Sequence, residues 1–322
     1  MTDSSAEAVI FSIQQFSTED GPGLRTTVFF KGCPMRCPWC HNPEAVNPKA
    51  EVVWHRERCL GDHGCIETCP ENALRAGPDG IEIDRALCVA CGRCVAFCPA
   101  SALEMHGERV GVRELFDRVA RDMAFYRESG GGVTLSGGEP LAQPVACAAL
   151  LRLLREHGIA NALDTCGAAT EAVWQEVLPW TDLILFDIKT VDPERHAQFT
   201  GVPFDRIRKS AVLINESGVE TWVRTPVIPG YTDDEESIRN VAQFVGENLR
   251  HCTRHDLLAF SNLCTAKYAQ LDRSFALAGA PLLTAAHMER LCAVARDAGS
   301  PHVRWSGPTQ CAALSHAEEQ AS

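Results

Sequence analysis

The sequence predicts an α/β protein with a mainly parallel sheet and a cysteine-rich insert after the first strand of the alternating series. Short apolar runs alternate with segments whose apolar residues recur at helical spacing, which is typical of strands joined by helical crossovers. Ten of the 16 cysteines lie from Cys33 to Cys98, and seven of those ten lie within residues 51–105. Periodicity alone does not separate a closed barrel from an open, doubly wound sheet.

Each element of the alternating pattern has its own apolar run. Strands are predicted at residues 26–30, 132–136, 161–164, 183–187, 220–225 and 256–260. Helices are predicted at residues 112–128, 143–157, 171–178, 205–216 and 235–248. We therefore predict one domain formed by residues 1–50 and 106–322 and an insert at residues 51–105, with a frayed tail after Gly307.

Composition and charge limit the classes of function. A hydrophobic content of 45% in 322 residues is ample for a large core. The net charge of −12 argues against a nucleic-acid partner, which normally calls for a basic face. We see neither a secretory signal nor an apolar run of membrane-spanning length. The 16 cysteines then indicate metal ligands rather than disulfides, and we expect a cytoplasmic, oxygen-sensitive monomer with no membrane contact.

One loop, directly after the first strand of the series, carries Cys33, Cys37 and Cys40 at the spacing C-x3-C-x2-C. Thiolates bind soft metals, and a closed zinc site or a fully protein-held iron–sulfur cluster needs four protein ligands. Three cysteines in one tight loop therefore indicate a cluster with one iron left open. Half of a zinc site, or a cysteine-rich loop without a metal, are the alternatives.

The insert contains two cysteine runs of the bacterial ferredoxin type, in which the fourth cysteine of a run ligates the other cluster. The second run, from Cys88 to Cys98, is complete at C-x2-C-x2-C-x3-C-P. The first run, from Cys59 to Cys69, has Asp62 where its second cysteine is expected. The predicted ligand sets are Cys69, Cys88, Cys91 and Cys94 for one cluster, and Cys59, Asp62, Cys65 and Cys98 for the other.

The iron at Asp62 should be labile, because a carboxylate is a harder ligand than a thiolate. We therefore predict a cluster that interconverts between [4Fe–4S] and [3Fe–4S]. Water in place of Asp62, or no fourth iron, are alternatives. His63 is a substitute ligand that breaks the spacing, and a zinc-binding knuckle is disfavoured by the complete second run.

Polar motifs lie before the first strand of the series and at later strand ends: D-G-P-G-x-R-T at 20–26, G-G-E at 137–139, D-T-C-G at 164–167, D-I-K at 187–189 and P-G at 229–230. Alone, each would be an ordinary turn, helix cap or surface ion pair. Together with the cysteine loop and the insert, they resemble the glycyl radical enzyme activating enzymes of the radical S-adenosylmethionine (SAM) superfamily. This resemblance spans nearly the whole chain and implies a partial (β/α)6 barrel with a ferredoxin-like insert that holds two [4Fe–4S] clusters.

The resemblance implies roles for individual residues. SAM would bind the open iron held by the cysteine loop, at a site formed by Trp39, Gly137, Gly138, Glu139, Asp164, Thr165, Asp187, Lys189, Arg224, Ser261 and Asn262. Asp164, Thr165 and Asp187 would also hold a monovalent cation near the SAM carboxylate. Asp20, Gly21 and Arg25 would contact the protein substrate.

Some residues depart from the family pattern or carry no clear role. Relatives often have a histidine after the aromatic residue of the sixth strand, where this chain has Ser261 and Asn262. The pair Lys267-Tyr268 is expected to face the protein partner or to begin an exposed helix. Four further cysteines are expected to be small core or surface residues: Cys147, Cys252, Cys292 and Cys311. Cys166 and Cys264 lie in candidate site loops without an assigned role.

The implied activity is the activation of a glycyl radical enzyme. Reduced flavodoxin or ferredoxin would pass an electron through the two auxiliary clusters. SAM would then be cleaved to methionine and a 5′-deoxyadenosyl radical, which abstracts a glycine Cα hydrogen of the partner. A radical SAM enzyme with a small-molecule substrate is the main alternative. A ferredoxin-type electron carrier would need neither the G-G-E motif nor the barrel.

Overall fold

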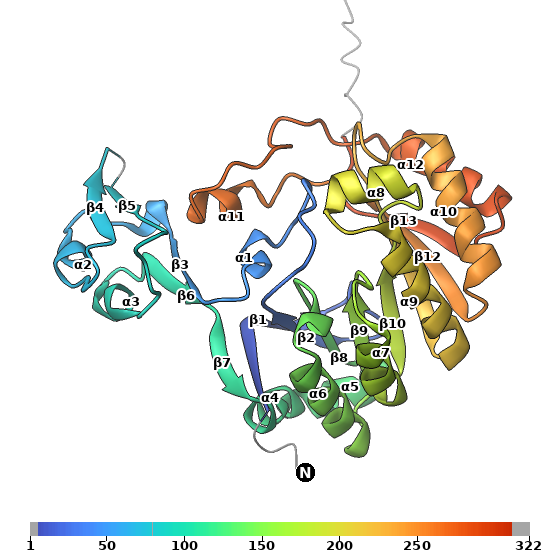
Figure 1. The fold of residues 1–322 in the computed structure, drawn as a ribbon, viewed down its shortest axis with the longest axis horizontal. Coiled ribbons are helices and arrows are strands. Elements are labelled where there is room, and N and C mark those ends of the chain that lie inside the picture. Colours follow the sequence, from blue (N-terminus) through green and yellow to red (C-terminus); the bar gives the residue numbers. More distant parts are fainter. Residues whose placement is uncertain (1–5, 79, 311–322) are drawn as a thin grey trace, which may run out of the picture.

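The computed structural model describes residues 6–78 and 80–310 (Figure 1). In this part of the chain the main sheet has nine strands in the order β13-β12-β11-β10-β9-β8-β2-β1-β7. Their bounds are β1 (Glu7–Ser17), β2 (Arg25–Phe30), β7 (Glu108–Gly111), β8 (Gly132–Gly137), β9 (Asn161–Thr165), β10 (Leu183–Asp187), β11 (Glu220–Val227), β12 (Cys252–Ala259) and β13 (Val303–Ser306). All pairs from β2 to β13 are parallel. The sheet is open between β7 and β13, which confirms the predicted partial barrel.

Helices connect the successive strands from β7 to β13 and cover the sheet (Figure 1). They are α4 (Val112–Val119), α5 (Met123–Ser129), α6 (Pro144–Glu156), α7 (Glu171–Val177), α8 (Pro193–Thr200), α9 (Phe204–Ser217), α10 (Glu235–Asn248) and α12 (Ala285–Asp297). The core between helices and sheet includes Val28, Leu135, Leu163 and Ile184, all fully buried. Within the described residues, no helix is both long and apolar enough to span a membrane.

The predicted helix over 112–128 is two helices, α4 and α5, separated by a 3-10 turn at Ala120–Asp122. The turn brings the buried Asp122 carboxylate to the sheet, where it accepts hydrogen bonds from Thr26 Oγ1 and Gln15 Nε2, both at 2.8 Å. Helical spacing of the apolar residues does not reveal this break, because both helices bury side chains against the same sheet.

Strands β1, β7 and β13 and helices α8 and α12 were not among the predicted elements. β1 and β7 pair antiparallel beside β2 and therefore fall outside the alternating pattern. β1 carries exposed glutamines, which hides its strand period, and β13 has only four residues. Helices α8 and α12 nevertheless belong to the alternating series, since each lies between two parallel strands in the sequence.

Residues 51–106 form two small antiparallel sheets, set to one side of the main sheet (Figure 1). β3 (Glu51–Trp54) pairs with β6 (Leu103–His106), and β4 (Leu74–Gly77) pairs with β5 (Gly80–Ile83). The short helices α2 (Gly64–Glu67) and α3 (Arg93–Phe97) lie between them in sequence. The segment has its own apolar cluster, which includes Val52, Leu74, Ile81 and Leu103. This separate cluster supports the proposed division of the chain at residues 51–105.

Two further short helices lie between the insert and the main sheet (Figure 1). They are α1 (Pro43–Val46), which follows the cysteine loop, and α11 (Thr265–Gln270), which follows β12. The loop that carries Cys33, Cys37 and Cys40 therefore leaves the sheet at β2 and ends against α1, between the barrel and the insert.

Candidate cofactor site

A cavity of about 690 Å³ lies at the carboxyl ends of the parallel strands. Gly137, Thr165, Asp187 and Ala259, which end β8, β9, β10 and β12, all line it. Ligands of parallel α/β proteins bind at this edge of the sheet, since the loops after the strands converge there. The volume is in the range of pockets for small molecules and cofactors.

All three cysteines of the loop after β2 line this cavity. The loop is held by backbone hydrogen bonds, among them Cys33 N–H to Val46 O at 3.2 Å and Arg36 N–H to Thr200 O at 2.8 Å. Burial raises the pKa of Cys37 to about 12 and that of Cys40 to about 11. Loading of a metal cluster on these thiols therefore has to release protons, because thiolates are the ligands.

The donor set of the loop fits a cluster with an open iron. Among residues 6–78 and 80–310, no three His, Cys, Asp or Glu side chains are placed to hold a single metal ion. A structural zinc needs four such ligands around one point. The loop cysteines instead border a cavity with room for a further ligand.

Gly137 and Gly138 bring the end of β8 against the strand that leads into the cysteine loop. Gly138 N–H donates to Phe30 O at 2.9 Å, and Glu139 N–H donates to Gly32 O at 2.8 Å. A Cβ on Gly137 would lie 2.4 Å from Phe30 N, and one on Gly138 would lie 2.5 Å from Gly32 O. Side chains are excluded by this approach, so both glycines leave bare backbone at the cavity wall.

Glu139 is not among the residues that line the cavity, although the G-G-E motif assigned it to the cofactor. The residue is 1% exposed, and its carboxylate accepts hydrogen bonds from Thr165 Oγ1 at 2.8 Å, Cys166 N–H at 2.8 Å and Leu141 N–H at 3.0 Å. These bonds join the loop after β8 to the loop after β9. Burial raises the pKa of Glu139 above its ordinary value.

Four charged side chains form a network where β9 and β10 end beside Arg224 of β11. Arg224 bridges two carboxylates, bonding Asp164 and Asp187, with Nε 3.1 Å from Asp187 Oδ1. Lys189 Nζ lies 2.6 Å from Asp187 Oδ2. Burial alone would raise the pKa of Asp187, but Lys189 and Arg224 hold it below its ordinary value. Burial raises the pKa of Asp164.

The same network includes two of the three residues that are expected to bind a monovalent cation, Asp164 and Asp187. Both carboxylates already have cationic partners, and the Thr165 hydroxyl donates to Glu139. A bound cation would therefore share Asp164 and Asp187 with Arg224 and Lys189.

Of Trp39, Ser261 and Asn262, which were all expected to contact SAM, the first two line the cavity and the third does not. Trp39 lines the cavity and packs edge-on against Phe199 and Tyr231, with ring centroids 5.9 and 5.3 Å away. Ser261 also lines the cavity, and its carbonyl bonds His41 Nε2 at 2.8 Å. Asn262 is not among the lining residues, and its amide donates to Ala278 O at 3.4 Å.

In the turn before β2, Asp20 lines the cavity but Arg25 does not. Asp20 Oδ2 accepts from Ser17 Oγ and Thr27 Oγ1, both at 2.7 Å. Arg25 is 1% exposed and donates from Nε to Thr134 Oγ1 at 2.6 Å. A Cβ on Gly21 would lie 2.9 Å from the Arg25 side chain. This packing does not support the expectation that Arg25 reaches a partner, because its buried side chain packs against the turn.

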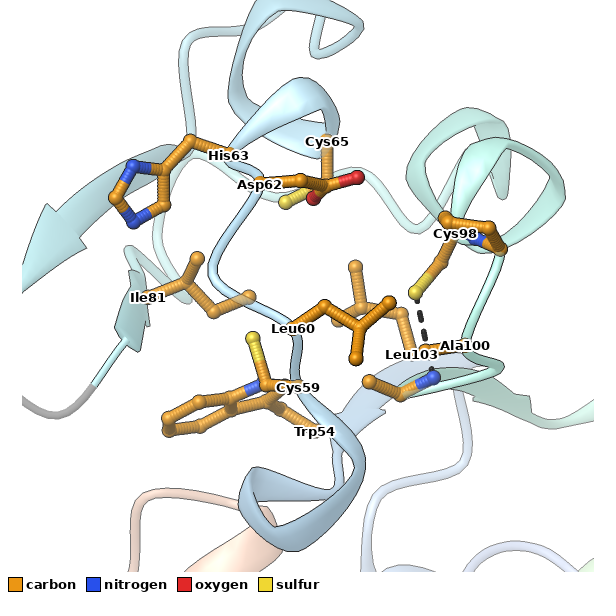
Figure 2. Close-up of a pocket in the computed structure, with 12 residues that line it drawn as sticks. Trp54, Cys59, Leu60, Asp62, His63, Cys65, Ile81, Cys98, Ala100 and Leu103 are labelled. Carbon is orange, nitrogen blue, oxygen red and sulfur yellow. Dashed lines mark hydrogen bonds between the residues drawn. The ribbon is translucent and has the colours of Figure 1, made fainter.

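Each predicted auxiliary ligand set lines a pocket of its own. Figure 2 shows the first pocket, around Cys59, Asp62, Cys65 and Cys98. The second pocket includes Cys69, Cys88, Cys91 and Cys94. The backbone N–H of Ala102 donates to Cys98 Sγ, and that of Ala73 donates to Cys69 Sγ, both at 3.3 Å.

Trp54 tests the fit of an iron–sulfur cluster to the first pocket. Its indole lies beside Cys59 at the pocket wall (Figure 2), and Nε1 is buried with no hydrogen-bond partner among the described residues. A buried donor without a partner costs free energy, and a cluster sulfide or thiolate would accept its hydrogen. Thiols, amide donors and this indole therefore form an environment that fits such a cluster.

Sequence reasoning missed several contacts around the cysteine loop. Tyr268 Oη donates to Cys40 O at 3.0 Å, and Lys267 Nζ lies 2.7 Å from Glu44 Oε1. The Lys267-Tyr268 pair therefore lies in the first turns of the exposed helix α11, as one of the two expectations had it, and contacts the loop. Cys166 lines the cavity, with Sγ 2.8 Å from Glu139 Oε2. Cys147, Cys252 and Cys292 are buried, whereas Cys311 lies outside the described residues.

Comparison with known proteins decides the family. The model described as the radical SAM superfamily matches residues 90–242, and one described as a 4Fe-4S single cluster domain matches residues 19–71. An isethionate sulfite-lyase activating enzyme from Oleidesulfovibrio alaskensis is 43% identical over 84% of this chain and 89% of its own length. The chain belongs to the glycyl radical enzyme activating enzymes.

Other activating enzymes match over similar lengths. The choline trimethylamine-lyase activating enzyme of O. alaskensis is 36% identical and covers 92% of this chain and 97% of its own length. A radical SAM methyltransferase from Sphaerobacter thermophilus, 13% identical, covers 94% of this chain and 78% of its own with a TM-score of 0.50, which bears on the fold alone. As a radical SAM activating enzyme, the protein uses a [4Fe–4S] cluster and SAM and acts on a glycyl radical enzyme.

Proposed function

We propose that this activating enzyme generates the glycyl radical of its partner in the cavity at the carboxyl ends of β8 to β12. The observation that carries the proposal is the convergence of the three-cysteine loop and the charged strand ends on one cavity. When bound, the cluster and SAM would supply a 5′-deoxyadenosyl radical by one-electron cleavage of SAM, with methionine as the other product, for removal of a glycine Cα hydrogen from the partner.

The residues of the chain bind and orient the groups. Cys33, Cys37 and Cys40 would hold three irons and leave the fourth to SAM. The bare backbone of Gly137 and Gly138 would receive the aminoacyl end of SAM.

The charged network offers SAM both signs of charge. The SAM carboxylate would pair with Lys189 and Arg224, and the SAM ammonium would pair with the carboxylates of Asp164 and Asp187. A monovalent cation bound by Asp164, Thr165 and Asp187 is part of the proposal. Because Trp39 and Phe260 are nearly fully buried, the apolar wall would also limit the access of water to the radical.

The protein partner would approach from the open side of the cavity. Asp20 and Glu19 line it from the turn before β2, and Leu263 lines it with 83% of its surface exposed. We propose that Asp20 accepts hydrogen bonds from the partner's glycine loop. Three relatives named isethionate sulfite-lyase activating enzymes, 43%, 41% and 38% identical, make isethionate sulfite-lyase the first partner to test.

Electrons would reach the cavity through the insert. We propose two auxiliary clusters in the two cysteine-lined pockets and reduced flavodoxin or ferredoxin as the donor. We also propose that the protein is a monomer. We place it in the cytoplasm, because cluster thiolates persist in a reducing compartment.

The test is an anaerobic mixture of the loaded enzyme, reductant, SAM and O. alaskensis isethionate sulfite-lyase. We expect a glycyl EPR doublet from the wild type, none from Cys37→Ala, and an undiminished doublet from Cys292→Ala, a buried cysteine outside the cavity. The choline and benzylsuccinate enzymes that partner the relatives extend the assay if the first partner is not recognised. SAM cleavage without a doublet from any of them would favour a small-molecule substrate, and no SAM cleavage would favour an electron carrier.

A further inference from the structure

We propose that Asp62 supplies a carboxylate ligand to one auxiliary cluster and that the iron it binds is exchangeable. The inference deepens the proposed function and rests on it in one respect, since it takes the insert to carry two clusters. It needs neither SAM nor a partner protein.

The two halves of the insert repeat the same backbone. Gly61 and Ala90, which precede Asp62 and Cys91, both have positive φ angles of 70° and 52°. The next residues, His63 and Gly92, again have positive φ, at 58° and 77°, and each is the N-cap of a short helix, α2 or α3. A left-handed conformation is uncommon in residues other than glycine, so its recurrence at Ala90 and His63 is a specific match.

The repeat extends to the cysteines. Asn72 and Ser101, three residues after Cys69 and Cys98, have φ angles of 50° and 48°. The amide that follows each of them donates to the sulfur of that cysteine, both at 3.3 Å. The two halves therefore bind their sulfurs in the same way, and Asp62 occupies the position of Cys91.

Burial follows the same order in both halves. Cys65 and Cys94 are buried, whereas Asp62 and Cys91 are exposed. Asp62 therefore lies where the complete run places its most exposed ligand. A carboxylate at this position keeps contact with water while facing the pocket, which reduces the cost of its charge.

The repeat also decides between Asp62 and His63. His63 corresponds to Gly92, which has no side chain, and Figure 2 shows its ring pointing away from Cys65 and Cys98. The Asp62 side chain instead lines the same pocket as Cys59, Cys65 and Cys98. The carboxylate is therefore the fourth group around the pocket.

The expected chemistry is the loss of one iron on mild oxidation. With ferricyanide as the one-electron acceptor, [4Fe–4S]²⁺ gives [3Fe–4S]⁺, Fe²⁺ and one electron, so charge and atoms balance. The Fe²⁺ leaves the Asp62 carboxylate as a hydrated ion, because a carboxylate binds it less tightly than a thiolate. The three cysteines of the set keep the remaining irons.

The test uses the full chain with Cys33, Cys37 and Cys40 all changed to alanine, so that signals arise from the insert alone. After anaerobic reconstitution the chain should hold about eight iron atoms. Ferricyanide should then release about one iron atom per chain and produce the EPR signal of an oxidised three-iron cluster. Re-addition of Fe²⁺ and reductant should restore the iron content.

Three variants of this chain separate the candidates. Asp62→Cys should keep its iron and give no three-iron signal, and His63→Gly should behave as the parent. Cys91→Asp, at the repeat position, should release a second iron atom and roughly double the signal. This last variant keeps the proposal testable if Asp62→Cys does not fold.

The outcomes distinguish the failure of this proposal from that of the proposed function. Equal spectra for the parent and Asp62→Cys, or a loss of the signal in His63→Gly, would overturn the role of Asp62. Release of only one iron atom from Cys91→Asp would overturn the equivalence of positions 62 and 91. An insert that takes up no iron would overturn the auxiliary clusters together with this inference, whereas the glycyl EPR assay tests the activity separately.

Discussion

The Glu139 carboxylate connects the loops after β8 and β9 from behind the cavity wall. The family resemblance implied that this residue contacts SAM, through the G-G-E motif at residues 137–139. Its burial could not be predicted from the motif, since it depends on donors from Thr165 and Cys166 that are distant in sequence. The grouping of the cysteines around three pockets could be predicted at this scale because their spacing is local, whereas the inward course of the Arg25 side chain could not.

Glu139→Ala should lower the free energy of unfolding by on the order of 3 kcal/mol, because it leaves several buried donors without an acceptor. Glu139→Gln should cost less, since it keeps one carbonyl oxygen. Anaerobic urea denaturation checks both, with Glu216→Ala, an exposed position on α9, as the matched control. Equal midpoints for Glu139→Ala and Glu216→Ala would contradict the network.

At the scale of elements, α11 and the two residues Asp272 and Arg273 join the cysteine loop to the insert. Tyr268 bonds the loop at Cys40 O. Arg273 donates to Pro43 O at 3.0 Å and to Glu51 Oε1 at 2.9 Å, and Arg85 of the insert lies 2.7 Å from Asp272. These contacts set the position of the insert, and hence of its proposed clusters, relative to the cavity.

Arg273→Ala should loosen the insert, because Glu51 at the start of β3 loses its pairing to Arg273. Hydrogen exchange of β3 and β6 should become about tenfold faster, which corresponds to about 1.4 kcal/mol of local stability. Arg290→Ala, an exposed position on α12, is the control and should leave these strands unchanged. Unchanged exchange in Arg273→Ala would show that other contacts hold the insert.

The parallel strands β2 and β8 to β12 could be predicted because buried strands are near-continuous apolar runs between amphipathic helices, whereas the four-residue strand β13 was missed. The connection made by α11 could not, since six polar and small residues after a loop show no period that points to their neighbours. β1 was missed for a related reason, because the consecutive exposed residues Gln14, Gln15 and Phe16 break the alternation of apolar and polar residues.

At the scale of the whole molecule, an open parallel sheet places one cavity at its carboxyl edge and a cysteine-rich insert beside it. The alternating pattern predicted the sheet but left barrel and open sheet undecided, because closure depends on the pairing of the edge strands. The family resemblance supplied the partial barrel, which the strand order confirms. Nothing in a single chain identifies the partner, since that specificity depends on a second surface.

The most direct measurement of the central claim follows a hydrogen atom. Isethionate sulfite-lyase labelled with glycine deuterated at Cα is mixed anaerobically with the loaded enzyme, SAM and reductant, and 5′-deoxyadenosine is analysed by mass spectrometry. We predict one deuterium in 5′-deoxyadenosine together with the glycyl EPR doublet, and neither from Cys37→Ala. A doublet with unlabelled 5′-deoxyadenosine would contradict direct abstraction from the glycine Cα by the radical formed in this cavity.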